Sequence, residues 1–128
     1  MAPDAKSLNI LVVDNGNSTT APVSVVLKQA GHRVDVVHDG EYALSSITQE
    51  PARYHLVITD HRMKFTGLEL ATGLRKIAFP GKILILSAFL PTEAEDAYRL
   101  LGVETFIFKP FDIADLRNAV EKLARSER

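Results

Sequence analysis

The sequence contains no cysteine among its 128 residues. This excludes disulfide bonds, thiolate metal sites and cysteine catalysis, and it is typical of a protein in a reducing compartment such as the cytoplasm. The net charge is only −1, so electrostatics favour neither a nucleic acid nor an anionic membrane as a partner. No apolar run approaches the ~20 residues that span a bilayer. Residues 1–7 lack the apolar core of a signal peptide.

What the sequence does contain is one pattern repeated five times. A short apolar run, typical of a strand, is followed by a segment whose apolar residues recur at helical spacing. The five apolar runs lie at 9–13, 34–37, 56–59, 83–86 and 106–108. Strict alternation predicts an α/β fold, a flavodoxin-like (βα)5 three-layer sandwich with parallel strands in the order 2-1-3-4-5. We expect one domain over 1–128, with its core at about 8–125.

Several local signals predict where helices begin and end. Gly31 and Gly102 are expected to stop the first and fourth helices. Thr92 and Glu95 have the spacing of a capping box, and Asp112 is expected to cap the last helix.

A polar residue follows four of the predicted strands. These residues are Asp14 with Asn15, Asp60, Ser87 and Lys109. Because ligands bind beyond the carboxyl ends of parallel strands, we expect them to converge at one edge of the sheet. Neighbouring carboxylates raise each other's pKa, and a hard cation such as Mg²⁺ relieves that repulsion. Lysine suits an anion, a serine hydroxyl can donate to a phosphoryl oxygen, and a carboxylate can form an acyl phosphate.

Four motifs occur in order along the chain. They are Val-Val-Asp at 12–14, Asp60 with Met63 three residues later, Leu-Ser-Ala at 86–88 and Phe-Lys-Pro-Phe at 108–111. Together they resemble the receiver domain of two-component response regulators, in the manner of the chemotaxis-type single-domain receivers. The resemblance covers about residues 8–125.

The resemblance implies a role for each residue at the predicted edge. Asp60 would be the phosphoacceptor, Lys109 would bind the phosphoryl group, and Ser87 with Phe106 would form the switch. The implied Mg²⁺ ligands are Asp14, Asn15, Asp60 and the backbone carbonyl of Arg62. The chain would catalyse phosphoryl transfer only to its own aspartate. The donor would be a histidine kinase or a phosphotransfer protein, and a downstream protein would bind the face at 92–125. The resemblance also allows a phosphorylation-linked dimer.

Three departures from the family pattern leave an alternative open. Asn15 stands where the family usually has a second carboxylate, Lys64 replaces a common proline, and Gly67 follows Asp60 by seven residues, one fewer than usual. The alternative is a pseudo-receiver, a phosphorylation-independent protein-interaction module. A flavin- or nucleotide-binding protein of the same fold is discounted, because the loop at 14–17 has a single glycine. The four histidines show no shared ligand spacing, and we interpret them as ordinary.

Overall fold

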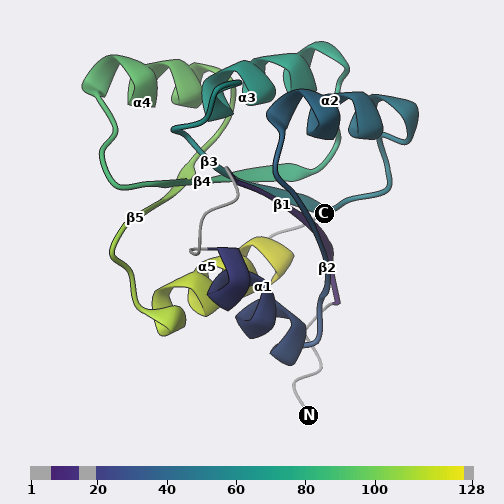
Figure 1. Ribbon diagram of the computed structural model, residues 1–128, viewed down its shortest axis with the longest axis vertical. Coiled ribbons are helices and arrows are strands. Elements are labelled where there is room, and N and C mark those ends of the chain that lie inside the picture. The colour runs from purple at the N-terminus through teal and green to yellow at the C-terminus, as the bar shows by residue number, and fades with distance from the viewer. Residues whose placement is uncertain (1–6, 15–19, 126–128) are drawn as a thin grey trace.

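The computed structural model describes residues 7–14 and 20–125. Five strands form one parallel sheet in the order β2-β1-β3-β4-β5, which confirms the predicted topology. The strands are β1 (Asn9–Val13), β2 (Arg33–Val37), β3 (Leu56–Asp60), β4 (Lys82–Ser87) and β5 (Thr105–Phe108). The helices are α1 (Thr20–Gln29), α2 (Gly40–Gln49), α3 (Gly67–Lys76), α4 (Thr92–Leu100) and α5 (Ile113–Arg125). Helices α2, α3 and α4 cover one face of the sheet, and α1 and α5 cover the other (Figure 1).

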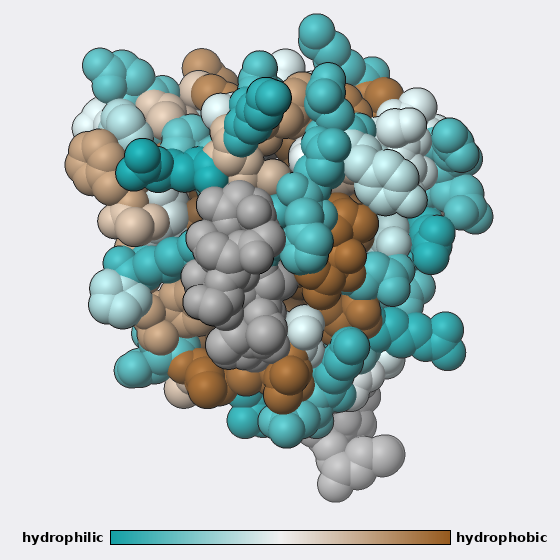
Figure 2. All heavy atoms as spheres, in the orientation of Figure 1, coloured by the Kyte–Doolittle hydropathy of each residue, from teal (hydrophilic) through white to brown (hydrophobic). Residues whose placement is uncertain are grey.

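Two apolar clusters hold the three layers together. Alternate residues of each strand point to opposite faces of a sheet. Leu11 and Val57 accordingly pack with α2, α3 and α4, whereas Ile10 and Ile58 pack with α1 and α5. The three central strands are almost entirely buried, as continuous apolar runs predict. Figure 2 shows a largely hydrophilic surface in this view, with apolar residues around α1 and the start of α5, where Val25 and Ile113 are exposed.

The ends of the helices confirm some of the sequence signals and correct one. Gly31 and Gly102 follow their helices with φ of 99° and 85°, a conformation that favours glycine. Helix α5 begins directly after Asp112, whose carbonyl accepts from Leu116 N at 3.3 Å. The capping box predicted at Thr92 is wrong. Pro91 is the N-cap of α4 and makes no side-chain capping bond, since a proline side chain has no acceptor, and Thr92 already lies in the first turn of the helix.

A capping box does exist, one helix earlier. Thr66 is the N-cap of α3 and its hydroxyl accepts from Glu69 N at 3.1 Å. The Glu69 carboxylate accepts from Thr66 N at 2.8 Å in return. Both bonds satisfy backbone donors that a helix start leaves open, so they fix where the β3–α3 loop ends. In the part of the chain that is described, no helix is long and apolar enough to cross a membrane.

Candidate phosphoryl-acceptor site

The polar residues that follow the strands do converge. Asp14 lies directly after β1, Asp60 ends β3, and Ser87 ends β4. Asp60 pairs with Leu86, and Ser87 pairs with Phe108. Lys109 directly follows Phe108, so it lies at the same edge of the sheet as the ends of β3 and β4. Asp14, Asp60 and Ser87 are all buried, with 3%, 5% and 4% of their surface exposed. Asn15, the remaining predicted member of this group, lies outside the described residues.

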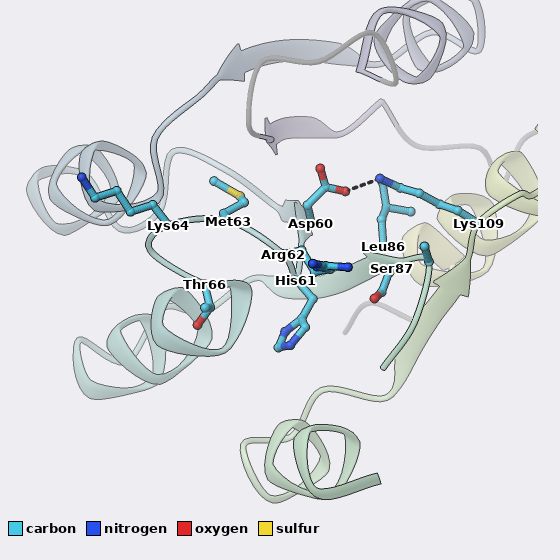
Figure 3. A pocket seen from close by; sticks show the side chains of 10 residues that line it. Asp60, His61, Arg62, Met63, Lys64, Thr66, Leu86, Ser87 and Lys109 are labelled. Carbon is cyan, nitrogen blue, oxygen red and sulfur yellow. Dashed lines mark hydrogen bonds and ion pairs between the residues drawn. The ribbon is translucent and has the colours of Figure 1, made fainter. Parts of the chain in front are cut away.

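Asp60 and Lys109 form the centre of the site. The Lys109 ammonium donates to Asp60 Oδ1 at 2.8 Å, and both side chains line a cleft of about 690 Å³ (Figure 3). Burial raises the pKa of the Asp60 carboxyl, the Lys109 ammonium partly opposes that rise, and the nearby Asp14 carboxylate adds to it. Two buried carboxylates therefore lie near each other at this site, an arrangement that a further cation would stabilise.

Ser87 also lines this cleft, but its hydroxyl is engaged locally. Ser87 Oγ donates to the carbonyl of Phe89 at 2.6 Å and accepts from the Phe89 amide at 3.2 Å. Arg62 lines the cleft as well and is exposed. Phe106, the predicted switch aromatic, is not brought into the cleft. It is half-buried on β5, with its ring 5.9 Å from that of Tyr98.

The short β3–α3 loop depends on a close approach at Gly67. A Cβ atom there would lie 2.7 Å from the carbonyl oxygen of Asp60 and 2.7 Å from the hydroxyl of Tyr98. The Gly67 amide also donates to the carbonyl of His61 at 3.1 Å. The loop is therefore folded tightly against the backbone of Asp60. A glycine seven residues after an acid predicts a turn, but the sequence does not show which groups press against it.

Two of the histidines that we interpreted as ordinary lie beside the site. His38 Nδ1 lies 2.7 Å from Asp14 Oδ1, and His61 Nδ1 lies 2.7 Å from the hydroxyl of Tyr98. The His38 contact follows from strand pairing, because Val13 pairs with Val37 and the next residue of each strand is then a neighbour. His61 points away from Asp60 toward α4, as expected for adjacent residues at a strand end (Figure 3).

The other two histidines are structural. His32 Nδ1 accepts from the Leu8 amide at 3.0 Å, and His55 Nδ1 accepts from the Asn9 amide at 2.9 Å. Both bonds attach the start of the first strand to a neighbouring segment. For these two residues the interpretation as ordinary histidines is consistent with the contacts.

The donor set fits a hard divalent cation. Two buried carboxylates, Asp14 and Asp60, lie close enough for one to raise the pKa of the other. Within residues 7–14 and 20–125, no group of three or more histidine, cysteine, aspartate or glutamate residues could hold a metal ion. Mg²⁺ needs fewer protein ligands, since it is usually bound by one or two carboxylates and keeps waters or phosphate oxygens in its remaining positions.

Comparison with known proteins decides the family. A family model of the response regulator receiver domain matches residues 10–121. The chain belongs to this family. This receiver domain is 30% identical, over 128 residues, to the sensory/regulatory protein RpfC of Xanthomonas campestris pv. campestris. The match covers 96% of this chain but only 17% of RpfC, so the receiver spans a small part of that relative.

Solved structures agree with the receiver fold. Chemotaxis protein CheY4 of Vibrio cholerae superposes with a TM-score of 0.81 at 26% identity, covering 92% of this receiver and 99% of CheY4. The receiver domain of sensor histidine kinase PA1611 from Pseudomonas aeruginosa PAO1 gives a TM-score of 0.81 at 22% identity. That match covers 94% of this receiver and 100% of the PA1611 domain, which was solved with a magnesium ion coordinated in its active-site cleft.

Proposed function

We propose that this receiver accepts a phosphoryl group on Asp60 from a histidine kinase or a phosphotransfer protein, with Mg²⁺, in the cytoplasm. The observation that carries the proposal is the 2.8 Å contact between the Lys109 ammonium and Asp60 Oδ1 at the wall of an open cleft. A buried carboxylate that faces solvent through a cleft and is held by a lysine can act as a nucleophile toward an incoming phosphoryl group.

The transfer exchanges one bond for another. The phosphorus–nitrogen bond of the donor phosphohistidine breaks as a carboxylate oxygen of Asp60 bonds to phosphorus, and the donor imidazole leaves. The Lys109 ammonium then donates to a phosphoryl oxygen instead of the free carboxylate. The Ser87 hydroxyl donates to a second phosphoryl oxygen instead of the Phe89 carbonyl. The receiver thereby catalyses a reaction only on its own aspartate.

The metal would be held where the Asp14 carboxylate approaches that of Asp60. We assign Asp14 and Asp60 as its carboxylate ligands, with the side chain of Asn15 and the backbone carbonyl of Arg62 as further oxygen donors. When bound, Mg²⁺ neutralises the negative charge that gathers as a phosphoryl group approaches two carboxylates. The PA1611 receiver, which was solved with a magnesium ion in its active-site cleft, supports Mg²⁺ as the cation.

The signal would leave through the face at 92–125, which includes α4, β5 and α5. A phosphoryl group adds charge and acceptor oxygens at Asp60. Ser87 and Lys109 respond to it at the ends of β4 and β5, and these strands connect directly to α4 and α5. A downstream protein, or a second phosphorylated copy of the chain, would bind the rearranged face.

Replacement of Lys109 tests this proposal. Wild type, Lys109→Met and Lys82→Met are treated with a small acyl phosphate and Mg²⁺, and labelling is followed by intact mass. Lys82 is the matched control, because it is an exposed lysine at the opposite end of β4. We expect wild type and Lys82→Met to label alike and Lys109→Met to label much more slowly. Equal labelling of all three would refute the role of Lys109, and no labelling of wild type would instead support a pseudo-receiver.

A further inference from the structure

Tyr98 connects α4 to the residue that follows Asp60. Its side chain is fully buried, with 0% of its surface exposed, and its hydroxyl lies 2.7 Å from His61 Nδ1. The two rings meet edge to face with centroids 5.6 Å apart. Figure 3 shows His61 on the side of the loop that faces α4, opposite the carboxylate of Asp60. A hydrogen bond therefore joins His61, the first residue after β3, to the fourth helix.

The same hydroxyl also lies in the bend of the loop. The Tyr98 oxygen is 2.7 Å from the position that a Cβ atom of Gly67 would occupy, and the backbone oxygen of Asp60 is equally close to that position. Tyr98 thus packs against both ends of the β3–α3 loop, at His61 and at Gly67. A shift of this loop on phosphorylation would press on the tyrosine or withdraw its hydrogen-bond partner.

On its other side, Tyr98 contacts the strand that was expected to carry the switch. The ring of Phe106 on β5 meets Tyr98 edge to face with centroids 5.9 Å apart. The Arg99 guanidinium lies 4.9 Å from the centre of the Phe106 ring and is itself held by Glu95 at 2.8 Å. Tyr98 already occupies the interior beside Phe106, so movement of Phe106 inward requires Tyr98 to move.

We propose that the His61–Tyr98 hydrogen bond couples the position of the β3–α3 loop to that of α4, and that Phe106 moves when Tyr98 moves. This inference rests on phosphoryl acceptance at Asp60. A buried hydroxyl that loses its partner is costly, so Tyr98 follows His61 when the loop moves. The loop and the helix then behave as one element with two arrangements, and a phosphoryl group shifts the population between them. Loss of one ordinary hydrogen bond changes such an equilibrium by about fivefold.

The test compares amide NMR spectra with and without beryllofluoride, a mimic of the phosphoryl group, in the presence of Mg²⁺. Tyr98→Phe removes only the hydroxyl. Tyr54→Phe is the matched control, because the buried Tyr54 also bonds through its hydroxyl, at 2.6 Å to Asp35, on another part of the sheet. His61→Asn is the conservative variant, since an amide oxygen can stand near the position of Nδ1.

In wild type and Tyr54→Phe, we expect beryllofluoride to change the amide chemical shifts of Asp60 and Lys109 and also those of residues 92–108. Tyr98→Phe should keep the shifts at Asp60 and Lys109 but lose most of those over 92–108, and His61→Asn should retain part of them. Unchanged shifts over 92–108 in Tyr98→Phe would overturn the link while leaving phosphoryl acceptance intact. Absence of shifts at Asp60 and Lys109 in wild type would overturn phosphoryl acceptance, and the link with it.

Discussion

Gly67→Ala should destabilise the receiver because of the atoms that surround this glycine. The added Cβ would lie 2.7 Å from the Asp60 carbonyl oxygen and from the Tyr98 hydroxyl, and 3.1 Å from the His61 Cα. Two of these three neighbours are backbone atoms of β3 and its loop, which cannot rotate away. Overpacking of this kind costs about 1–3 kcal/mol. We therefore expect a loss of about 2 kcal/mol, or roughly 6–10 °C in Tm for a domain of this size.

Gly73→Ala provides the matched control within the same helix. The three atoms nearest to its Cβ would all belong to the Leu44 side chain, namely the two terminal carbons and Cγ, and this flexible side chain can rotate away. Alanine in a helix interior is favoured over glycine by about 1 kcal/mol, which offsets the adjustment of Leu44. The free energy of unfolding, measured by urea titration, should therefore hardly change in Gly73→Ala.

A double variant identifies the hydroxyl as part of the clash. In a Tyr98→Phe background one of the two closest neighbours is absent, so Gly67→Ala should cost less there than in wild type, by on the order of 1 kcal/mol. Equal stability losses in Gly67→Ala and Gly73→Ala, or strict additivity with Tyr98→Phe, would refute the geometry described for the loop.

Four further predictions concern the loop, the fold and the site. Thr66→Ala should lower the free energy of unfolding by about 1 kcal/mol in urea titrations, because the N-cap of α3 is lost. Burial lowers the pKa of His32 from 6.5, so the unfolded chain binds a proton first as pH falls, and stability should decline from pH 7 to 5 less steeply in His32→Asn than in wild type. Asn15→Asp should tighten Mg²⁺ binding by about 1–3 kcal/mol in a calorimetric titration, since it adds a charged oxygen ligand; an unchanged or weaker affinity would contradict this. Arg62→Ala and Phe89→Ala should each speed loss of the phosphoryl group in a chase experiment, because Arg62 lines the cleft and Phe89 lies two residues after Ser87, where large exposed side chains would hinder water; unchanged rates would contradict it.

The periodic features of the sequence were sufficient to predict the fold. The five apolar runs predicted the five strands, and their strict alternation with helical segments predicted the parallel order 2-1-3-4-5 that the sheet has. The capping box at Thr92 was wrong because the same spacing can fall one residue inside a helix. The capping box at Thr66 was missed because the spacing of its two residues does not by itself show where a helix starts.

The site was predictable wherever it depends on strand ends. Asp14, Asp60, Ser87 and Lys109 each follow a recognisable strand, and the strand order brings them together. Contacts between elements were not predictable in this way. Nothing in the spacing of Tyr98 along its helix indicates that its hydroxyl reaches His61, because that contact depends on how α4 packs across the β3–α3 loop.

The most direct test of phosphoryl acceptance at Asp60 is the intact mass of the receiver after treatment with a small acyl phosphate. Wild type and Asp60→Asn are compared with Mg²⁺ and with a chelator. We predict that wild type gains the mass of one phosphoryl group only when Mg²⁺ is present, and that Asp60→Asn gains none. An equal mass gain in Asp60→Asn would contradict phosphoryl acceptance at Asp60, and labelling of wild type that is indifferent to Mg²⁺ would contradict the role assigned to the cation.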